Sequence, residues 1–267
     1  MTATALTIAG SDPSGGAGLQ ADLKTFHQHR VYGMSVVTLL TVQNTRAVSA
    51  VDIVRPDLVV AQLDAVLSDI APAAAKTGAL GNAAIIEAVA DRLGPTRFPL
   101  IIDPVMVSKH GAPLMAPEAA KALISRLLPR AFLVTPNLAE AEQLAGMKAD
   151  SIASMERAAR LIASMGPRHV LVKGGHLAGE ASDLLLADGH ATLLPAGRVE
   201  TPHTHGTGCV LSAAITARLA RGEEVGAAAR GAKEFVRLAI KTNPGLGGGF
   251  GPINMFADPR GDPTHAG

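Results

Sequence analysis

The segment from residue 132 to residue 145 decides the fold class, and it reads Phe132-Leu-Val-Thr-Pro-Asn-Leu-Ala-Glu-Ala-Glu-Gln-Leu-Ala145. Its first four residues form a short apolar run typical of a buried strand, and the residues from Leu138 onward have the spacing of a helix. Strands that alternate with helices in this way form a mainly parallel sheet with helices on both faces. The segment therefore predicts an α/β fold.

The same alternation extends along most of the 267 residues. The predicted strands are 6–9, 35–42, 48–54, 74–77, 100–103, 132–135 and 170–173. The predicted helices are 19–29, 57–70, 83–93, 117–128, 138–145, 154–165, 208–221 and 225–241. Apolar runs at 182–186 and 191–195 flank Asp188-Gly189, a dipeptide typical of a hairpin turn. We expect one domain over residues 1–257 and a loose tail over residues 258–267.

Composition excludes several classes of protein. A net charge of +1 and an aromatic content of 3%, with no Trp, leave neither a basic patch nor a stacking platform for nucleic acid. The chain has no run of about 18 apolar residues, so we expect no membrane span. Its apolar start lacks the basic region of a signal peptide and predicts a strand instead. A single cysteine excludes a disulfide framework and favours a reducing, cytoplasmic location.

A glycine-rich turn leads into a helix of small residues at His203-Thr-His-Gly-Thr-Gly-Cys-Val-Leu-Ser-Ala-Ala214. Backbone N–H groups at a helix start have no partner within the helix, so this turn can hold a phosphate. The positive electrostatic field of these N–H groups favours the thiolate form of Cys209, the one cysteine of the sequence. Cys209 is therefore a candidate base. The alternative is that Cys209 is only a small residue packed at the start of a helix.

Polar residues follow the ends of several predicted strands, where ligands bind in open α/β sheets. Asp103 and Glu140 are carboxylates suited to holding Mg²⁺ directly or through waters. Lys173 is suited to a nucleotide phosphate. Together with the turn at Gly206–Gly208, these residues supply what phosphoryl transfer needs: a metal, a cation, oriented N–H groups and a base. The structural alternatives are a helix cap or surface charge for the carboxylates and a salt bridge for the lysine.

Familiar nucleotide signatures are absent. Gly10–Gly15 has the glycine spacing of a P-loop, but Gly16-Ala17 stands where Lys-Ser/Thr is required. The sequence contains no GxGxxG and none of the protein-kinase motifs. His203 and His205 could suggest a metal, but no third ligand is spaced to complete a zinc site.

Six motifs resemble those of one known family. They are Ala5-Leu-Thr-Ile-Ala-Gly-Ser-Asp-Pro-Ser-Gly-Gly-Ala-Gly-Leu-Gln-Ala-Asp-Leu-Lys-Thr-Phe26, Val42-Gln-Asn-Thr45, Ile102-Asp-Pro-Val-Met106, Thr135-Pro-Asn-Leu-Ala-Glu140, Val172-Lys-Gly-Gly-His176 and Thr204-His-Gly-Thr-Gly-Cys209. Over about residues 5–256 the chain resembles the ribokinase-like small-molecule kinases. Within them it resembles the hydroxymethylpyrimidine/phosphomethylpyrimidine kinases of thiamine biosynthesis.

This resemblance implies a three-layer α/β/α sandwich, a homodimer, and the use of ATP and Mg²⁺ to phosphorylate an aminopyrimidine twice. The residues implied to contact the pyrimidine are Gly10, Asp22, Gln43 and Val105. Those implied for ATP and metal are Asn137, Lys173, Glu140 and Asp103, and Lys233 on the last helix is expected to approach ATP. The implied anion hole is Gly206, Thr207 and Gly208, beside Cys209 as the base.

The chain departs from the family pattern at two places. Ala79 stands where the family usually has a pocket-lining methionine, which loosens the pocket or admits a bulkier substrate. Met255 stands where the tail motif has a histidine, so no role for that histidine is carried over. Two alternatives stay open: a pyridoxal kinase on the same scaffold, which Ala79 favours and Gln43 disfavours, and a non-catalytic pyrimidine-binding regulator.

Overall fold

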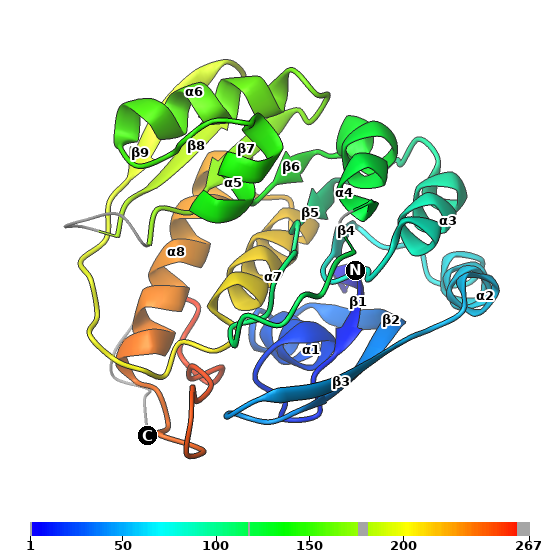
Figure 1. The fold of residues 1–267 in the computed structure, drawn as a ribbon, viewed down its shortest axis with the longest axis horizontal. Helices are drawn as coiled ribbons and strands as arrows, with labels where there is room; N and C mark the ends of the chain where they lie inside the picture. The colour runs from blue at the N-terminus through cyan, green and yellow to red at the C-terminus, as the bar shows by residue number, and fades with distance from the viewer. Residues whose placement is uncertain (1, 117, 176–180, 261–267) are drawn as a thin grey trace.

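The computed structural model describes residues 2–116, 118–175 and 181–260. Within these ranges a nine-stranded sheet runs through the molecule in the order β3-β2-β1-β4-β5-β6-β7-β8-β9 (Figure 1). Its parallel part comprises β1 (Thr4–Ser11), β2 (Tyr32–Gln43), β4 (Ala74–Thr77), β5 (Leu100–Ile102), β6 (Leu133–Val134) and β7 (His169–Val172). Antiparallel strands complete both edges: β3 (Val48–Ile53), β8 (Asp183–Ala187) and β9 (His190–Leu194).

Helices cover both faces of this sheet, which confirms the predicted three-layer architecture (Figure 1). One layer contains α1 (Gly18–Gln28), α7 (Thr207–Ala220) and α8 (Val225–Lys241). The other contains α2 (Pro56–Leu67), α3 (Ala83–Leu93), α4 (Ala119–Ala122), α5 (Leu138–Ala145) and α6 (Ile152–Ala163). None of the described helices is long and apolar enough to cross a membrane.

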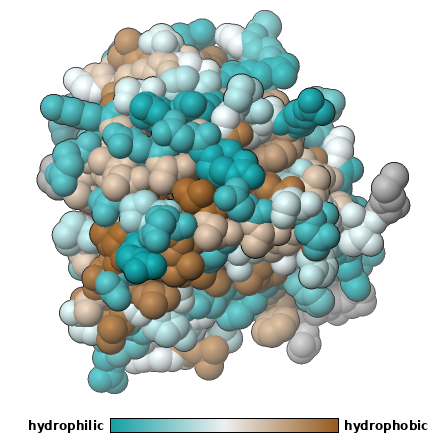
Figure 2. Space-filling model, turned by 90° about the vertical axis from the view of Figure 1, so that its right-hand side faces the viewer, coloured by the Kyte–Doolittle hydropathy of each residue, from teal (hydrophilic) through white to brown (hydrophobic). Residues whose placement is uncertain are grey.

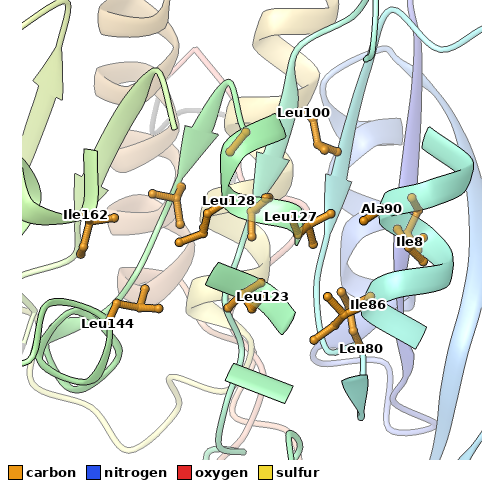
Figure 3. Packing of buried hydrophobic residues seen from close by; sticks show 14 of the residues in the cluster. Ile8, Leu80, Ile86, Ala90, Leu100, Leu123, Leu127, Leu128, Leu144 and Ile162 are labelled. Atoms are coloured by element: carbon orange, nitrogen blue, oxygen red, sulfur yellow. The ribbon is translucent and has the colours of Figure 1, made fainter. Parts of the chain in front are cut away.

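Alternation along the central strands explains the two layers. In β5, Leu100 and Ile102 join the core cluster beneath α2–α6, while Ile101 joins the cluster beneath α7 and α8. Figure 3 shows Leu100 and Ile8 in the first cluster, among helix residues such as Ile86. Because successive side chains point to opposite faces, a strand that is apolar throughout is buried on both sides.

Several predicted elements coincide with the observed ones, namely β4, α3, α5 and α8. The hairpin is confirmed between β8 and β9, where Asp188 and Gly189 both have positive φ angles of 46° and 81°. The helix predicted over 117–128 is wrong in part. Among its described residues it is α-helical only over Ala119–Ala122, continues as a π turn over Leu123–Leu127, and closes with a 3₁₀ turn at Leu128–Arg130. Pro129 lacks the N–H that a continuing α-helix requires.

Two predicted segments extend beyond the described residues. The helix predicted over 117–128 begins at Pro117, which lies outside them. Residues 261–267, which make up most of the tail expected to be loose, also lie outside them. Within the described part of that tail, Arg260 donates to the Asp258 carboxylate.

Candidate active site

A cavity of about 670 Å³ lies among residues that follow the carboxyl ends of the parallel strands. This is where an open α/β sheet places its ligand site. Every residue that the sequence assigned to a site lines this cavity: Gly10, Asp22, Gln43, Ala79, Asp103, Val105, Asn137, Glu140, Lys173, Gly206, Thr207, Gly208, Cys209 and Lys233. The structure thus brings the whole predicted set together, and the role of each residue stays a prediction.

The glycine turn at the start of α7 is set by a close backbone approach. Gly206 has a φ of 80°, and a Cβ on it would lie 1.8 Å from the carbonyl oxygen of Gly16. No other residue fits there. A Cβ on Gly208 would lie 3.3 Å from Lys173 Nζ. The N-terminal end of α7 therefore faces a lysine ammonium, and both favour an anion between them.

A buried cluster of charges surrounds that ammonium. Lys173 Nζ lies 3.0 Å from Asp103 Oδ1 and 4.0 Å from Glu140 Oε2. Ser212 donates to Asp103 at 3.1 Å, and the backbone N–H of Asn137 donates to Glu140 at 2.8 Å. The Asn137 side chain in turn caps α5 by accepting from the N–H of Glu140. The helix-cap alternative that the sequence left open for the carboxylates is therefore present at Glu140, whose side chain also lines the cavity.

The cluster carries more negative than positive charge. The pKa of Glu140 is raised to about 7; burial is the main cause, Lys173 opposes it, and the nearby Asp103 adds to it. For Asp103, the effects of Lys173 and Lys76 outweigh burial, and its pKa is lowered. A divalent cation would offset this excess. Among the described residues no three His, Cys, Asp or Glu side chains converge on one point. Two carboxylates nevertheless fit Mg²⁺, which takes its remaining ligands from water and phosphate.

Cys209 is half-buried at the start of α7, and one expectation about it is wrong. The sequence predicted that the helix start favours the thiolate. Burial instead raises the pKa of the Cys209 thiol to about 12, and the carboxylates of Asp22 and Asp103 add to the increase while Lys76 opposes it. Loss of water around the sulfur outweighs the field of the helix, so the resting group is the neutral thiol.

Asp22 lines the cavity in an ion pair that sequence analysis missed. Its Oδ1 lies 2.6 Å from Lys76 Nζ, and its Oδ2 accepts from Thr7 Oγ1 at 2.6 Å. The Asp22 and Lys76 side chains are fully buried, and Lys76 Nζ also lies 3.4 Å from the carbonyl oxygen of Cys209. The available signal was a lysine inside the short strand Ala74–Thr77, where a buried charge requires a partner.

Lys233 is also paired. Its Nζ lies 2.7 Å from Asp183 Oδ2 and donates to the carbonyl oxygen of Ala181 at 2.7 Å. This anchors α8 to the start of β8 at one wall of the cavity. Contact with ATP stays a prediction.

A second missed residue is His205, which the sequence considered only as half of a metal pair. It is 3% exposed, and its Nε2 lies 2.8 Å from Asp12 Oδ2 and 3.1 Å from Gln43 Nε2. It thus joins the loop after β1 to the end of β2, immediately before the glycine turn.

Comparisons with known proteins identify one family of kinases. A model of the phosphomethylpyrimidine kinase family matches residues 12–254. The hydroxymethylpyrimidine/phosphomethylpyrimidine kinase of Synechococcus elongatus is 49% identical over 254 residues, covering 94% of this chain and 97% of that protein.

Solved structures of related kinases have the same fold. An ADP complex of Bacillus subtilis pyridoxal kinase superposes with a TM-score of 0.89 at 41% identity, covering 96% of this chain and 98% of that one. The phosphomethylpyrimidine kinase of Clostridium difficile gives a TM-score of 0.78 at 42% identity, covering 87% and 97%. The chain belongs to the phosphomethylpyrimidine kinase family.

Proposed function

We propose that this chain uses ATP to phosphorylate 4-amino-5-hydroxymethyl-2-methylpyrimidine to its monophosphate and then to the diphosphate, in thiamine biosynthesis. One observation carries the proposal: the glycine turn of α7 faces the Asp103–Lys173–Glu140 cluster inside a single cavity. The identities of 43–50% to kinases named for this pyrimidine support the substrate.

Each part of the cavity has a task in the transfer. Lys173 holds a phosphate of ATP, and Asp103 and Glu140 hold Mg²⁺, which when bound supplies positive charge to the ATP phosphates. The N–H groups of Gly206–Gly208 stabilise the charge on the transferring phosphoryl group. The pyrimidine lies between Gly10, Gln43 and Val105, with its hydroxymethyl oxygen in line with the γ-phosphate.

Cys209 accepts the hydroxyl proton at its sulfur as the oxygen attacks. To do so the thiol first releases its own proton to solvent, which leaves the thiolate as the base, and the buried ammonium of Lys76 opposes the rise in its pKa. The second transfer differs, because the monophosphate already carries ionised oxygens and needs no base.

A second candidate activity is the phosphorylation of pyridoxal. Two observations favour it: the small residue Ala79 lines the cavity, and a Bacillus subtilis pyridoxal kinase has the same fold at a TM-score of 0.89. Comparing kcat/KM for pyridoxal and for the pyrimidine in one ATP-consumption assay decides between them. A non-catalytic binding role is disfavoured, because the residues for metal, phosphate and proton transfer are all present in the cavity.

Gln43→Leu is expected to raise the KM for the pyrimidine well over tenfold, since unpaired buried polar groups cost about 1–3 kcal/mol each. The amide of Gln43 suits the edge of an aminopyrimidine, which offers both donors and acceptors. Steady-state kinetics at saturating ATP measure the change. An unchanged pyrimidine KM, or a higher kcat/KM for pyridoxal in the unmodified protein, contradicts the substrate assignment.

Ala79→Met is expected to tighten pyrimidine binding or leave it unchanged, with little effect on the KM for ATP. The added side chain fills volume beside the ring, and Ala79 is half-buried at the cavity wall. Titration calorimetry with the pyrimidine measures the affinity. A large loss for the pyrimidine with none for ATP means that the pocket is shaped for another ligand.

We also propose a homodimer. The β2–β3 ribbon exposes large apolar residues at one edge of the sheet, among them Leu40, Val42 and Ile53, with 49%, 62% and 38% of their surface exposed. Figure 2, which views the side of the molecule nearest α2, shows hydrophobic atoms gathered on the lower part of that face. An exposed apolar edge strand is prone to pair with another chain, and a second copy of this chain would cover it. Sedimentation at micromolar concentration tests this, and a monomer contradicts it.

A further inference from the structure

Asp12, in the loop after β1, has both of its carboxylate oxygens hydrogen-bonded. Its Oδ1 accepts from the backbone N–H and the hydroxyl of Ser14, at 2.9 and 2.7 Å, and its Oδ2 accepts from the N–H of Ala17 at 2.9 Å. Burial raises its pKa, but hydrogen bonds from His205 and Ser14 outweigh burial, and the pKa is lowered. Asp12 is therefore an ionised carboxylate, which can only accept hydrogen bonds.

That fixes the proton on the neighbouring imidazole. His205 Nε2 lies 2.8 Å from Asp12 Oδ2, and the two side chains are each 4% exposed. Since the carboxylate is a pure acceptor, the imidazole nitrogen that faces it must carry a hydrogen and donate it. His205 Nε2 then has no lone pair to offer to any other donor.

Gln43 approaches the same nitrogen. Its Nε2 lies 3.1 Å from His205 Nε2, an arrangement that sets two donors against each other. Turning the amide by 180° exchanges its oxygen and nitrogen without changing its shape. Gln43 Oε1 then accepts from the same His205 N–H that Asp12 accepts from, and the two acceptors share it in a three-centre hydrogen bond. The amide NH₂ group of Gln43 then points away from the imidazole. Gln43 itself lines the cavity.

We propose that His205 is a positioning residue for substrate specificity: hydrogen-bonded to Asp12, it holds the Gln43 amide with its oxygen toward the imidazole and its NH₂ toward the cavity. This wall then presents a donor and selects a ligand with an acceptor there, such as the ring nitrogen of an aminopyrimidine. The inference rests on the proposed function for the identity of that ligand. His205 also joins two loops, so a purely structural role must be separated from this one.

A double-mutant cycle makes that separation. His205→Leu is expected to raise the pyrimidine KM about tenfold with kcat changed by less than about threefold, and to have under a twofold effect on KM in the Gln43→Leu background. His205→Gln, which keeps a donor facing Asp12 and Gln43, should restore KM to within about threefold of the unmodified protein. His203→Leu, two residues earlier and outside the cavity lining, serves as the matched control. Equal effects of His205→Leu in both backgrounds overturn the proposal.

A second measurement does not depend on turnover. Nitrogen NMR of the ligand-free protein with ¹⁵N-labelled histidine reports which ring nitrogens carry a proton. We expect a proton on Nε2 of His205, and an unprotonated Nε2 overturns the inference whatever the enzyme phosphorylates. If the proton is on Nε2 but the unmodified protein does not phosphorylate the pyrimidine, the proposed function fails and the His205–Gln43 arrangement stands.

Discussion

Cys209→Ala is expected to lower kcat for hydroxymethylpyrimidine by about 10²–10⁴-fold, the usual contribution of a positioned base, and kcat for the monophosphate only mildly. The alcohol must lose a proton as it attacks, whereas the monophosphate is already mostly ionised near neutral pH, its second pKa being about 6. Initial rates with the two substrates at saturating ATP measure the difference. Unchanged ATP affinity and melting temperature are the controls.

The pH dependence sharpens this test. Because burial raises the pKa of Cys209 to about 12, the thiolate fraction increases with pH throughout the assay range. The rate with the alcohol should therefore rise by up to about tenfold per pH unit from pH 6 to 9, while the rate with the monophosphate should level off above its second pKa of about 6. Equal losses on both substrates in Cys209→Ala indicate a damaged Gly206–Gly208 turn instead. Loss on neither substrate makes Cys209 a packed residue at a helix start.

Lys76→Met is expected to destabilise the protein by about 3–5 kcal/mol, because it leaves the Asp22 carboxylate buried without its partner. At about 2–4 °C per kcal/mol, the melting temperature should fall by roughly 10 °C. Adding Asp22→Asn removes the unpaired charge and should recover part of the loss. Denaturant unfolding of the ligand-free protein measures each step.

Lys148→Met is the matched control for that experiment. Lys148 pairs with Glu142 at 3.2 Å, but its side chain is 81% exposed, and an exposed pair contributes less than about 1 kcal/mol. If Lys76→Met is no more destabilising than Lys148→Met, the buried pair with Asp22 does not stabilise the fold.

The sequence predicts the architecture well because each element's signal is local. The run Ala74–Thr77 and the helix Leu138–Ala145, with its Asn137 cap, are recognisable from neighbouring residues alone, and the structure has them at the predicted bounds. The π turn before Pro129 departs from prediction, because the apolar spacing of residues 117–128 continues past the point where the backbone changes.

In the candidate site, too, the residues with a local signal are predictable and the contacts between distant residues are not. Strand-end residues such as Asp103 and Lys173 are predictable, since the carboxyl ends of parallel strands meet at one edge of the sheet. Their pairings are not, because they join positions far apart in the chain: Asp22 with Lys76, and His205 with Asp12. The thiol pKa was predicted in the wrong direction for the same reason, since burial of Cys209 depends on the packing of distant segments.

The most direct test of the account is an ATP-consumption assay with hydroxymethylpyrimidine, its monophosphate and pyridoxal side by side. We expect turnover of both pyrimidines, with a kcat/KM for hydroxymethylpyrimidine above that for pyridoxal, and we expect that turnover to be abolished without Mg²⁺. A higher kcat/KM for pyridoxal, or no ATP consumption with either pyrimidine, would contradict it.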